Sequence, residues 1–318
     1  MAGASPPPAT QNSDGSWLRR VWDSDIGWSF RHSPVAIVSA IVSIVMILAA
    51  VLAPLFAPQD PFNPAVLNLM EGLTPPGTPN EFTQKSFVFG SDSQGRDMFS
   101  AVLYGTQVSL LVGAASVLFS AVFGVLLGLM AGYIGGKTES IIMRIADIQL
   151  SFPAILIALL IFGVARGLIP PGQQEDATLI LLILAIGLSN WAQYARTVRG
   201  STMVEKNKEY VQAARVIGRS PFLIMVKHIL PNVMGPVTVI ATINLALAII
   251  EEATLSFLGV GMPPTQPSLG TLIRVGQQFL FSGEWWILFF PAITLVILAL
   301  AINLLGDWLR DALNPRLR

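Results

Sequence analysis

Six long apolar stretches constrain the fold of this chain more than any other feature of its sequence. Each meets or approaches the roughly 20 residues that an α-helix needs to cross the hydrocarbon core of a bilayer. Charged residues make up only 12% of the 318 residues, about half the share of a soluble domain. The sequence therefore predicts an all-α membrane protein with six transmembrane helices. They are expected at residues 35–57, 107–133, 141–165, 178–194, 236–260 and 286–305.

The distribution of Lys and Arg orients these helices, because basic residues concentrate in cytoplasmic loops. With the N-terminus inside, most of the 19 basic residues fall in inner segments. The exceptions are Lys85, Arg96, Arg166 and Arg274. Both termini are therefore predicted to be cytoplasmic, and so is the polar loop 198–233.

The chain divides at the ends of the apolar stretches. The first sixteen residues are rich in Pro, Ser and Ala and are expected to be disordered. The first apolar stretch is predicted to be a retained anchor, because it is too long for a signal peptide and no small-residue cleavage site follows it. We expect a cytoplasmic tail at residues 1–34, the anchor at 35–57 and an extracytoplasmic segment at 58–106. The transmembrane core is expected at 107–306, and a second cytoplasmic tail at 307–318.

One polar stretch, EYVQAARVIGRSPFLIMVKHILPN at residues 209–232, stands between two apolar spans. Its pattern predicts two short helices, over 206–216 and 221–229. Gly218 permits the turn between them because it lacks a Cβ atom. Pro231 is expected to end the second helix, because a proline disfavours helix at the residue before it. From the residues alone, an amphipathic loop lying on lipid headgroups is an equal alternative.

Within this stretch, Ala213-Ala214-x3-Gly218, followed after nine residues by His228-Ile-Leu-Pro231, resembles the EAA loop of importer-type ABC transporter permeases. In that family the loop docks into a cleft of the cytoplasmic ATPase subunit and transmits its motion to the membrane helices. The resemblance implies an ATPase-coupling loop. Its implied contact residues are Glu209, Gln212, Ala213, Ala214, Gly218, Pro221, Leu230 and Pro231.

The loop departs from the family pattern at two positions. Gln212 stands where the family usually has Glu, and His228 stands where it usually has Ile. Glutamine keeps hydrogen-bonding capacity but has no charge, so an ion pair with the ATPase is not expected there. Glu209, one turn earlier, is the candidate substitute.

Four further segments lie at residues 32–61, 89–105, 251–270 and 303–318. Each resembles a segment of the C-type permease of dipeptide and oligopeptide importers, and they follow one another in the same order as in that family. This implies an importer-type ABC permease fold, a paralogous permease subunit as heterodimer partner, two cytoplasmic ATPase subunits and an extracytoplasmic substrate-binding protein. ATP and Mg would be held by the ATPases, and this subunit would bind no cofactor and perform no covalent chemistry. The resemblance also implies that the subunit lies in the plasma (inner) membrane of a bacterium or archaeon. Nickel importers share this group and are the alternative.

Two adjacent carboxylates, Glu251 and Glu252, fall in the outer part of the fifth span, with Ser256 one turn later. Ionisable groups inside a span are costly and often functional. One interpretation has a carboxylate line the pathway and bind the amino group of a peptide, or a cation. The other has it form a structural hydrogen bond to the partner permease or to residues 261–285. A proton relay is a weaker alternative, with Asp147 the only other candidate acid.

Two polar motifs outside the spans have competing interpretations. Asp92, Arg96 and Asp97 precede the second span and are candidates for contact with a binding protein, or for a local network. The segment AGYIGGKT, residues 131–138, fits a relaxed phosphate-binding P-loop pattern. Because that loop works between a strand and a helix and this segment follows a membrane span, we predict a glycine-rich turn.

Other function classes fit the sequence less well. A secondary transporter driven by an ion gradient predicts internal repeats, and no clear repeat is evident. A membrane enzyme needs a nucleophile and base or metal ligands, yet the chain has no Cys and only two His, His32 and His228. The net charge of zero gives no indication of nucleic-acid binding.

Overall fold

The computed structural model describes residues 25–312, and the elements named in that range are all helical. The predictions for residues 1–24 and 313–318 lie outside it. Short 3₁₀ turns occur at Pro64–Val66, Leu69–Glu71, Pro171–Gln173 and Leu280–Ser282. The α-helices are α2 (Asp25–His32), α3 (Pro34–Val51), α4 (Ala53–Phe56), α5 (Met98–Ile134), α6 (Gly136–Leu150), α7 (Ala154–Gly167), α8 (Gln174–Glu205), α9 (Glu209–Val216), α10 (Pro221–Ile224), α11 (Leu230–Phe257), α12 (Leu269–Gln277) and α13 (Trp286–Ala312).

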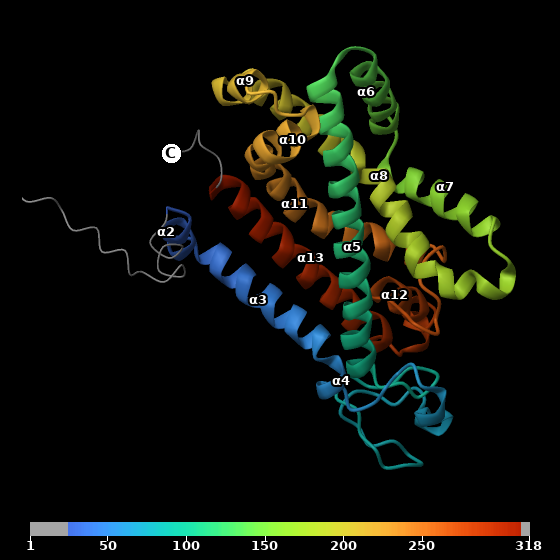
Figure 1. The fold of residues 1–318 in the computed structure, drawn as a ribbon. Coiled ribbons are helices and arrows are strands. Elements are labelled where there is room, and N and C mark those ends of the chain that lie inside the picture. The colour runs from blue at the N-terminus through green and yellow to red at the C-terminus, as the bar shows by residue number, and fades with distance from the viewer. Residues whose placement is uncertain (1–24, 313–318) are drawn as a thin grey trace, which may run out of the picture.

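Helices α5 and α8 form the centre of the bundle and run parallel (Figure 1). Gly124, Gly128 and Gly132 follow one another at four-residue spacing along α5 and face the backbone of α8. A Cβ atom on Gly128 would lie only 2.6 Å from the nearest carbonyl oxygen. Small residues at this spacing let membrane helices approach closely. The carbonyl groups that the three glycines meet belong to Trp191, Ala195 and Arg199.

The third predicted span, 141–165, is not one continuous helix. Helices α6 and α7 meet at an angle of 101°, and the break lies at Ser151-Phe152-Pro153. Pro153 disfavours helical geometry at Phe152, and it stands at the position before the first residue of α7. The apolar composition therefore identified the segment, but the proline divides it.

The bent pair α6–α7 nevertheless crosses the bundle once. Because α5 and α8 run parallel, the chain between them must return from the end of α5 to the start of α8. Glu139 of α6 pairs with Arg199 near the end of α8, and Arg166 of α7 contacts Gln174 at its start. Within residues 25–312, five helices are long and apolar enough to cross a membrane, and the bent pair, taken as one span, gives a sixth crossing.

Both ends of the described range lie at the same end of the bundle as α9, here called the loop end (Figure 1). Helices α3 and α13 lie side by side, and the ring of Phe30 before α3 packs edge-on against Trp308 near the end of α13, with centroids 5.1 Å apart. Ala36 and Ala40 of α3 are small and buried.

The unbroken span helices α5, α8, α11 and α13 are longer than the apolar stretches that predicted them, whereas α3 ends at Val51 instead of residue 57. Helix α5 begins at Met98 instead of residue 107, and α13 continues to Ala312 instead of ending at 305. Helix α8 extends beyond the predicted 178–194 at both ends. Hydropathy identifies only the part of a helix inside hydrocarbon, so polar turns at its ends give no signal.

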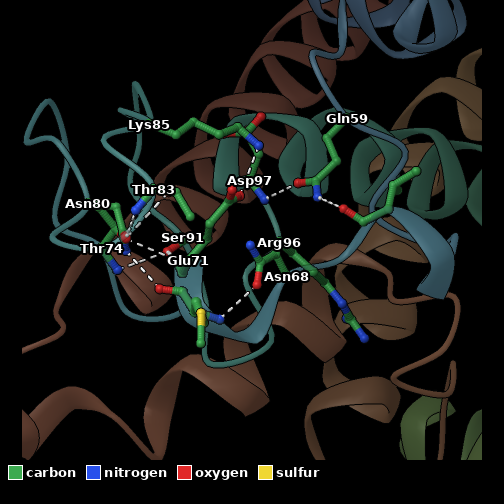
Figure 2. A network of polar contacts seen from close by, with 12 residues as sticks. Gln59, Asn68, Glu71, Thr74, Asn80, Thr83, Lys85, Ser91, Arg96 and Asp97 are labelled. Atoms are coloured by element: carbon green, nitrogen blue, oxygen red, sulfur yellow. Dashed lines mark hydrogen bonds and ion pairs between the residues drawn. The ribbon is translucent and has the colours of Figure 1, made fainter.

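The segment that leads into α5 is folded at the end of the bundle opposite the loop end. Figure 2 shows its polar network, in which Lys85 pairs with Glu71 at 2.9 Å and Gln59 accepts the backbone N–H of Asp97 at 2.8 Å. The indole N–H of Trp286 donates to the carbonyl of Ser91 at 3.0 Å, which ties the segment to α13. Most of its polar groups are therefore used within the chain.

The glycine-rich segment 131–138 is the turn between α5 and α6, as predicted. Gly135 and Gly136 have φ angles of 73° and 58°, a region that glycine adopts without a steric penalty. With a helix on each side, the segment lacks the strand that a phosphate-binding loop requires.

The contact between α5 and α8 predicts that Gly128→Ala lowers the free energy of unfolding by about 1–3 kcal/mol, the usual cost of overpacking. Gly163→Ala in α7 is the matched control, because no atom lies within 4 Å of the added Cβ. The midpoint of thermal unfolding in detergent measures both. Equal midpoints for the two variants would contradict this account of the helix contact.

Candidate functional site

The polar loop between α8 and α11 forms two short helices joined by a sharp turn, as the sequence predicts. Helix α9 ends beside Gly218, whose φ of 79° reverses the chain. The hydroxyl of Ser220 then caps α10 by accepting the backbone N–H of Leu223 at 3.4 Å. The turn therefore depends on a backbone conformation that L-residues with a side chain rarely adopt.

The predicted helix end before Pro231 is wrong. A π-helical turn at Met225–Ile229 follows α10, and the N–H of Leu230 bonds to the carbonyl of Met225. Pro231 then occupies the first turn of α11, where its missing N–H is not needed. The chain consequently stays helical from the loop into the membrane span.

One side of the loop is packed into the membrane core. Val211, Ala214, Ile224 and Ile229 are buried in one cluster with side chains of α5, α8 and α11. Ala214, predicted to contact an ATPase, therefore faces the interior of this chain. The buried side packs the loop against the three helices.

Polar contacts hold the loop to α5 as well. Lys206 Nζ donates to the carbonyl of Gly132 at 2.7 Å. The guanidinium of Arg215 lies 5.2 Å from the centre of the Tyr133 ring, within the range of a cation–π contact. Both contacts join the loop to the last turn of α5.

Tyr210 is a residue of the loop that the sequence analysis did not select. Its hydroxyl donates to Glu205 at 2.6 Å and accepts from the side-chain amide of Asn232 at 3.2 Å. Desolvation, together with the Glu205 carboxylate, raises the pKa of Tyr210 to about 12, so the hydroxyl stays protonated at neutral pH. The residues come from three helices, and no periodicity in the sequence links them.

The other side of the loop is exposed and apolar at its tip. Val216, Ile217 and Phe222 are 87%, 76% and 69% exposed. Gln212 is also exposed, and its side-chain amide donates to the carbonyl of Asn207 at 3.0 Å. Apolar residues flanking the Gly-Arg-Ser-Pro bend were the available signal in the sequence, but none of Val216, Ile217 and Phe222 was predicted to be a contact residue. We call the following exposed residues the docking surface: Glu209, Gln212, Ala213, Val216, Ile217, Gly218, Pro221 and Phe222.

The two carboxylates of α11 have different surroundings. Glu252 is completely buried and accepts hydrogen bonds from Ser109 and Ser256, each at 2.7 Å. The two serine oxygens accept in turn the backbone N–H groups of Leu269 at 3.2 Å and Met262 at 3.1 Å. The carboxylate thus joins α5 and α11 to the segment that enters α12.

Glu251 is partly exposed between α8 and α11. Its carboxylate accepts the side-chain amide of Asn190 at 2.9 Å. The amide of Gln149, beside the break between α6 and α7, donates to the carbonyl of Ser189 at 2.9 Å. Asp147 instead pairs with Arg196 of α8. Polar groups from three helices therefore gather near Glu251, and Asp147 is engaged elsewhere.

The charged cluster before α5 makes local contacts. Asp92 and Asp97 are buried, and Asp92 accepts the backbone N–H groups of Gln94 and Arg96 at 2.8 and 3.0 Å. Burial raises the pKa of Asp92, although the N–H groups and the guanidinium of Arg96 oppose the shift. Arg96 Nη1 also donates to the carbonyl of Pro264 at 3.0 Å. A contact with a binding protein stays a prediction.

Two family models match the chain. Residues 124–318 match the binding-protein-dependent transport system inner membrane component, and residues 16–76 match the N-terminal transmembrane domain of oligopeptide transport permease C. Among solved structures, an inward-facing MetNI methionine ABC transporter has a TM-score of 0.53 and 22% identity, over 68% of this chain and 98% of that one. This last similarity concerns the fold alone.

Several curated relatives are similar over most of their length. A di/tripeptide transport system permease protein of Pseudomonas aeruginosa is 38% identical over 77% of each chain. A dipeptide transport system permease protein of Haemophilus influenzae is 36% identical, over 81% of this chain and 83% of that one. An oligopeptide transport system permease protein of Bacillus subtilis is 37% identical, over 83% and 81%.

The Glu252 contacts predict that Glu252→Ala releases the segment entering α12. Because a hydrogen bond inside a protein contributes about 0.5–1.5 kcal/mol, amide exchange at Met262 and Leu269 should accelerate about two- to tenfold. Glu251→Ala is the control and should leave both amides unchanged, since Glu251 contacts neither. Equal exchange rates in the two variants would show that Glu252 does not hold this segment.

Proposed function

Since the chain belongs to the family of binding-protein-dependent transport system inner membrane components, we propose that it is the permease subunit of an ATP-driven importer of di- and oligopeptides. The observation that carries the proposal is the docking surface, an exposed apolar tip on a helical loop that continues directly into α11. The peptide substrate is supported by the relatives, whose names are those of peptide permeases.

The docking surface has the chemistry of a protein contact. Three large apolar side chains at the tip would leave water on docking, and burying each is worth roughly 1.5–3 kcal/mol. Glu209 is exposed at the start of α9 and supplies the charge that Gln212 lacks. Because Gln212 is engaged by the carbonyl of Asn207, the proposal assigns any ion pair with the ATPase to Glu209.

In the proposed mechanism this subunit converts movement of the ATPases into movement of its helices. ATP and Mg are held by two cytoplasmic ATPase subunits, whose closure displaces the docking surface. The loop moves with α8 and α11, because it is packed against them, and the spans change from inward- to outward-facing. ATP hydrolysis resets them, and this subunit performs no covalent step.

The proposal places the chain in the plasma (inner) membrane of a bacterium or archaeon, with both termini cytoplasmic. A paralogous permease completes the translocation path as heterodimer partner, and an extracytoplasmic binding protein delivers the substrate. The partly exposed Glu251 supports a second permease, because a carboxylate facing lipid is costly. At the interface between two permeases it would line an aqueous path and receive the ammonium group of a peptide.

Gly218 offers a test of docking. Gly218→Val should reduce ATPase recovery and peptide uptake about tenfold, because a left-handed backbone costs a side-chain-bearing residue roughly 1–2 kcal/mol and a β-branched one more. Steric overlap with neighbouring residues is not the cause, since no atom lies within 4 Å of the added Cβ. ATPase subunits that co-purify from detergent, and ATP-driven uptake of radiolabelled dialanine and pentaalanine, are the measurements.

Gly200→Val is the matched control. Gly200 also has no neighbour within 4 Å, but it has ordinary helical geometry in α8, so ATPase recovery and uptake should be retained. Full recovery and uptake in the Gly218 variant would contradict the role of the turn. A transport-active wild-type preparation with no ATPase subunit would contradict the proposed function itself.

The pathway assignment of Glu251 can be tested by thiol labelling, because the chain contains no cysteine. A Glu251→Cys variant should react with a methanethiosulfonate ethylammonium reagent about tenfold faster than Ala248→Cys, since labelling follows exposure. Ala248 lies one turn earlier in α11 and is 2% exposed. Excess dialanine should slow the reaction at residue 251. Equal labelling of both variants would place Glu251 outside an aqueous path.

A further inference from the structure

We propose that Tyr210 is a positioning residue for transport, because its hydroxyl connects the docking surface to α8 and to the π-helical turn Met225–Ile229 at the start of α11. Movement of the docking surface would pass through this connection, here called the joint. The inference rests on the proposed function and adds the residue that transmits the movement.

One hydroxyl group links three helices at the joint. Tyr210 of α9 donates to Glu205, the last residue of α8, and accepts from Asn232 in the first turn of α11. Lys208 Nζ donates to the other Glu205 oxygen at 2.7 Å, so both oxygens of the carboxylate are engaged. A displacement of α9 would therefore strain hydrogen bonds to both span helices, α8 and α11, at once.

The π-helical turn beside the joint is the place where the long helix from α10 to α11 can change its geometry. A regular α-helix would bond the N–H of residue 231 to the carbonyl of Lys227, and Pro231 has no N–H. The carbonyl of His228 accepts the side-chain amide of Asn232 at 2.7 Å. Asn232 thus bonds both to the turn and to Tyr210. π-helical turns are rare and occur frequently at functional sites.

Transmission and docking depend on different parts of α9. The Tyr210 ring is 38% exposed and lies outside the buried cluster that includes Val211 and Ala214. Removing its hydroxyl therefore opens no cavity and leaves the docking surface unchanged. The substitution Tyr210→Phe deletes the bonds of the joint and little else.

The test measures amide exchange in the complex of permease and ATPase subunits in nanodiscs. Exchange is compared without nucleotide and with Mg-ATP plus orthovanadate. In the wild type, two regions should respond to nucleotide: the loop residues 209–217, and residues 228–236, which cover the end of the π-helical turn and the first turns of α11. In Tyr210→Phe the loop should respond as in the wild type, while the α11 response should fall about fivefold, the effect of losing a hydrogen bond of ordinary strength.

Three further variants separate transmission from folding. Glu205→Ala should reproduce the effect of Tyr210→Phe, whereas Glu205→Gln keeps an acceptor for the hydroxyl and should restore most of the α11 response. Tyr133→Phe is the matched control: it removes a hydroxyl from the loop end of α5 and keeps the ring beneath Arg215. Its exchange should match the wild type in both regions.

The possible results are distinct. A wild-type α11 response in Tyr210→Phe would overturn the proposal, and so would loss of the loop response in that variant, because Tyr210 would then belong to the docking contact. An equal loss in Tyr133→Phe would also overturn it. A wild-type complex in which nucleotide leaves residues 209–217 unchanged would instead contradict the proposed function.

Discussion

Three glycines of α5 lie directly against the carbonyl groups of α8, and the arrangement of the other helices depends on this contact. Because Gly124, Gly128 and Gly132 meet residues of α8 in the same order along both helices, α5 and α8 run parallel. The intervening chain must then cross the bundle, which the bent pair α6–α7 does. The same contact brings the ends of α5 and α8 together, where they provide the surface that receives the buried side of the loop.

The polar groups inside the bundle differ in their partners and in their burial. Glu252 has two serine donors whose oxygens are themselves bonded to the backbone near α12, so it stabilises a local fold. Glu251, the adjacent residue, has an amide partner and is partly exposed. A helix places neighbouring residues about 100° apart, and this rotation gives the two glutamates different surroundings.

Much of the fold could be predicted from local composition. Apolar length located the six crossings, and the Gly218 bend with Ser220 correctly divided the loop into two helices. Three features were predicted wrongly or missed, each because the prediction used only local composition. Pro231 was expected to stop a helix, but the preceding π-helical turn places it where no N–H is required. Pro153 did interrupt a helix, and apolar composition over 141–165 obscured that break. The start of α5 at Met98 was missed because its first turns lie outside the apolar stretch.

The sequence by itself determined the membrane class, the number of crossings and the polar loop, because these depend on the hydropathy and backbone preferences of consecutive residues. Only the tertiary structure decided which loop residues are exposed and which are buried. It turned Ala214 inward, left Phe222 exposed, and brought Tyr210 to Glu205 and Asn232. Those contacts join residues from three helices. The distances between these residues are set by helix packing, so no single stretch of the sequence predicts them.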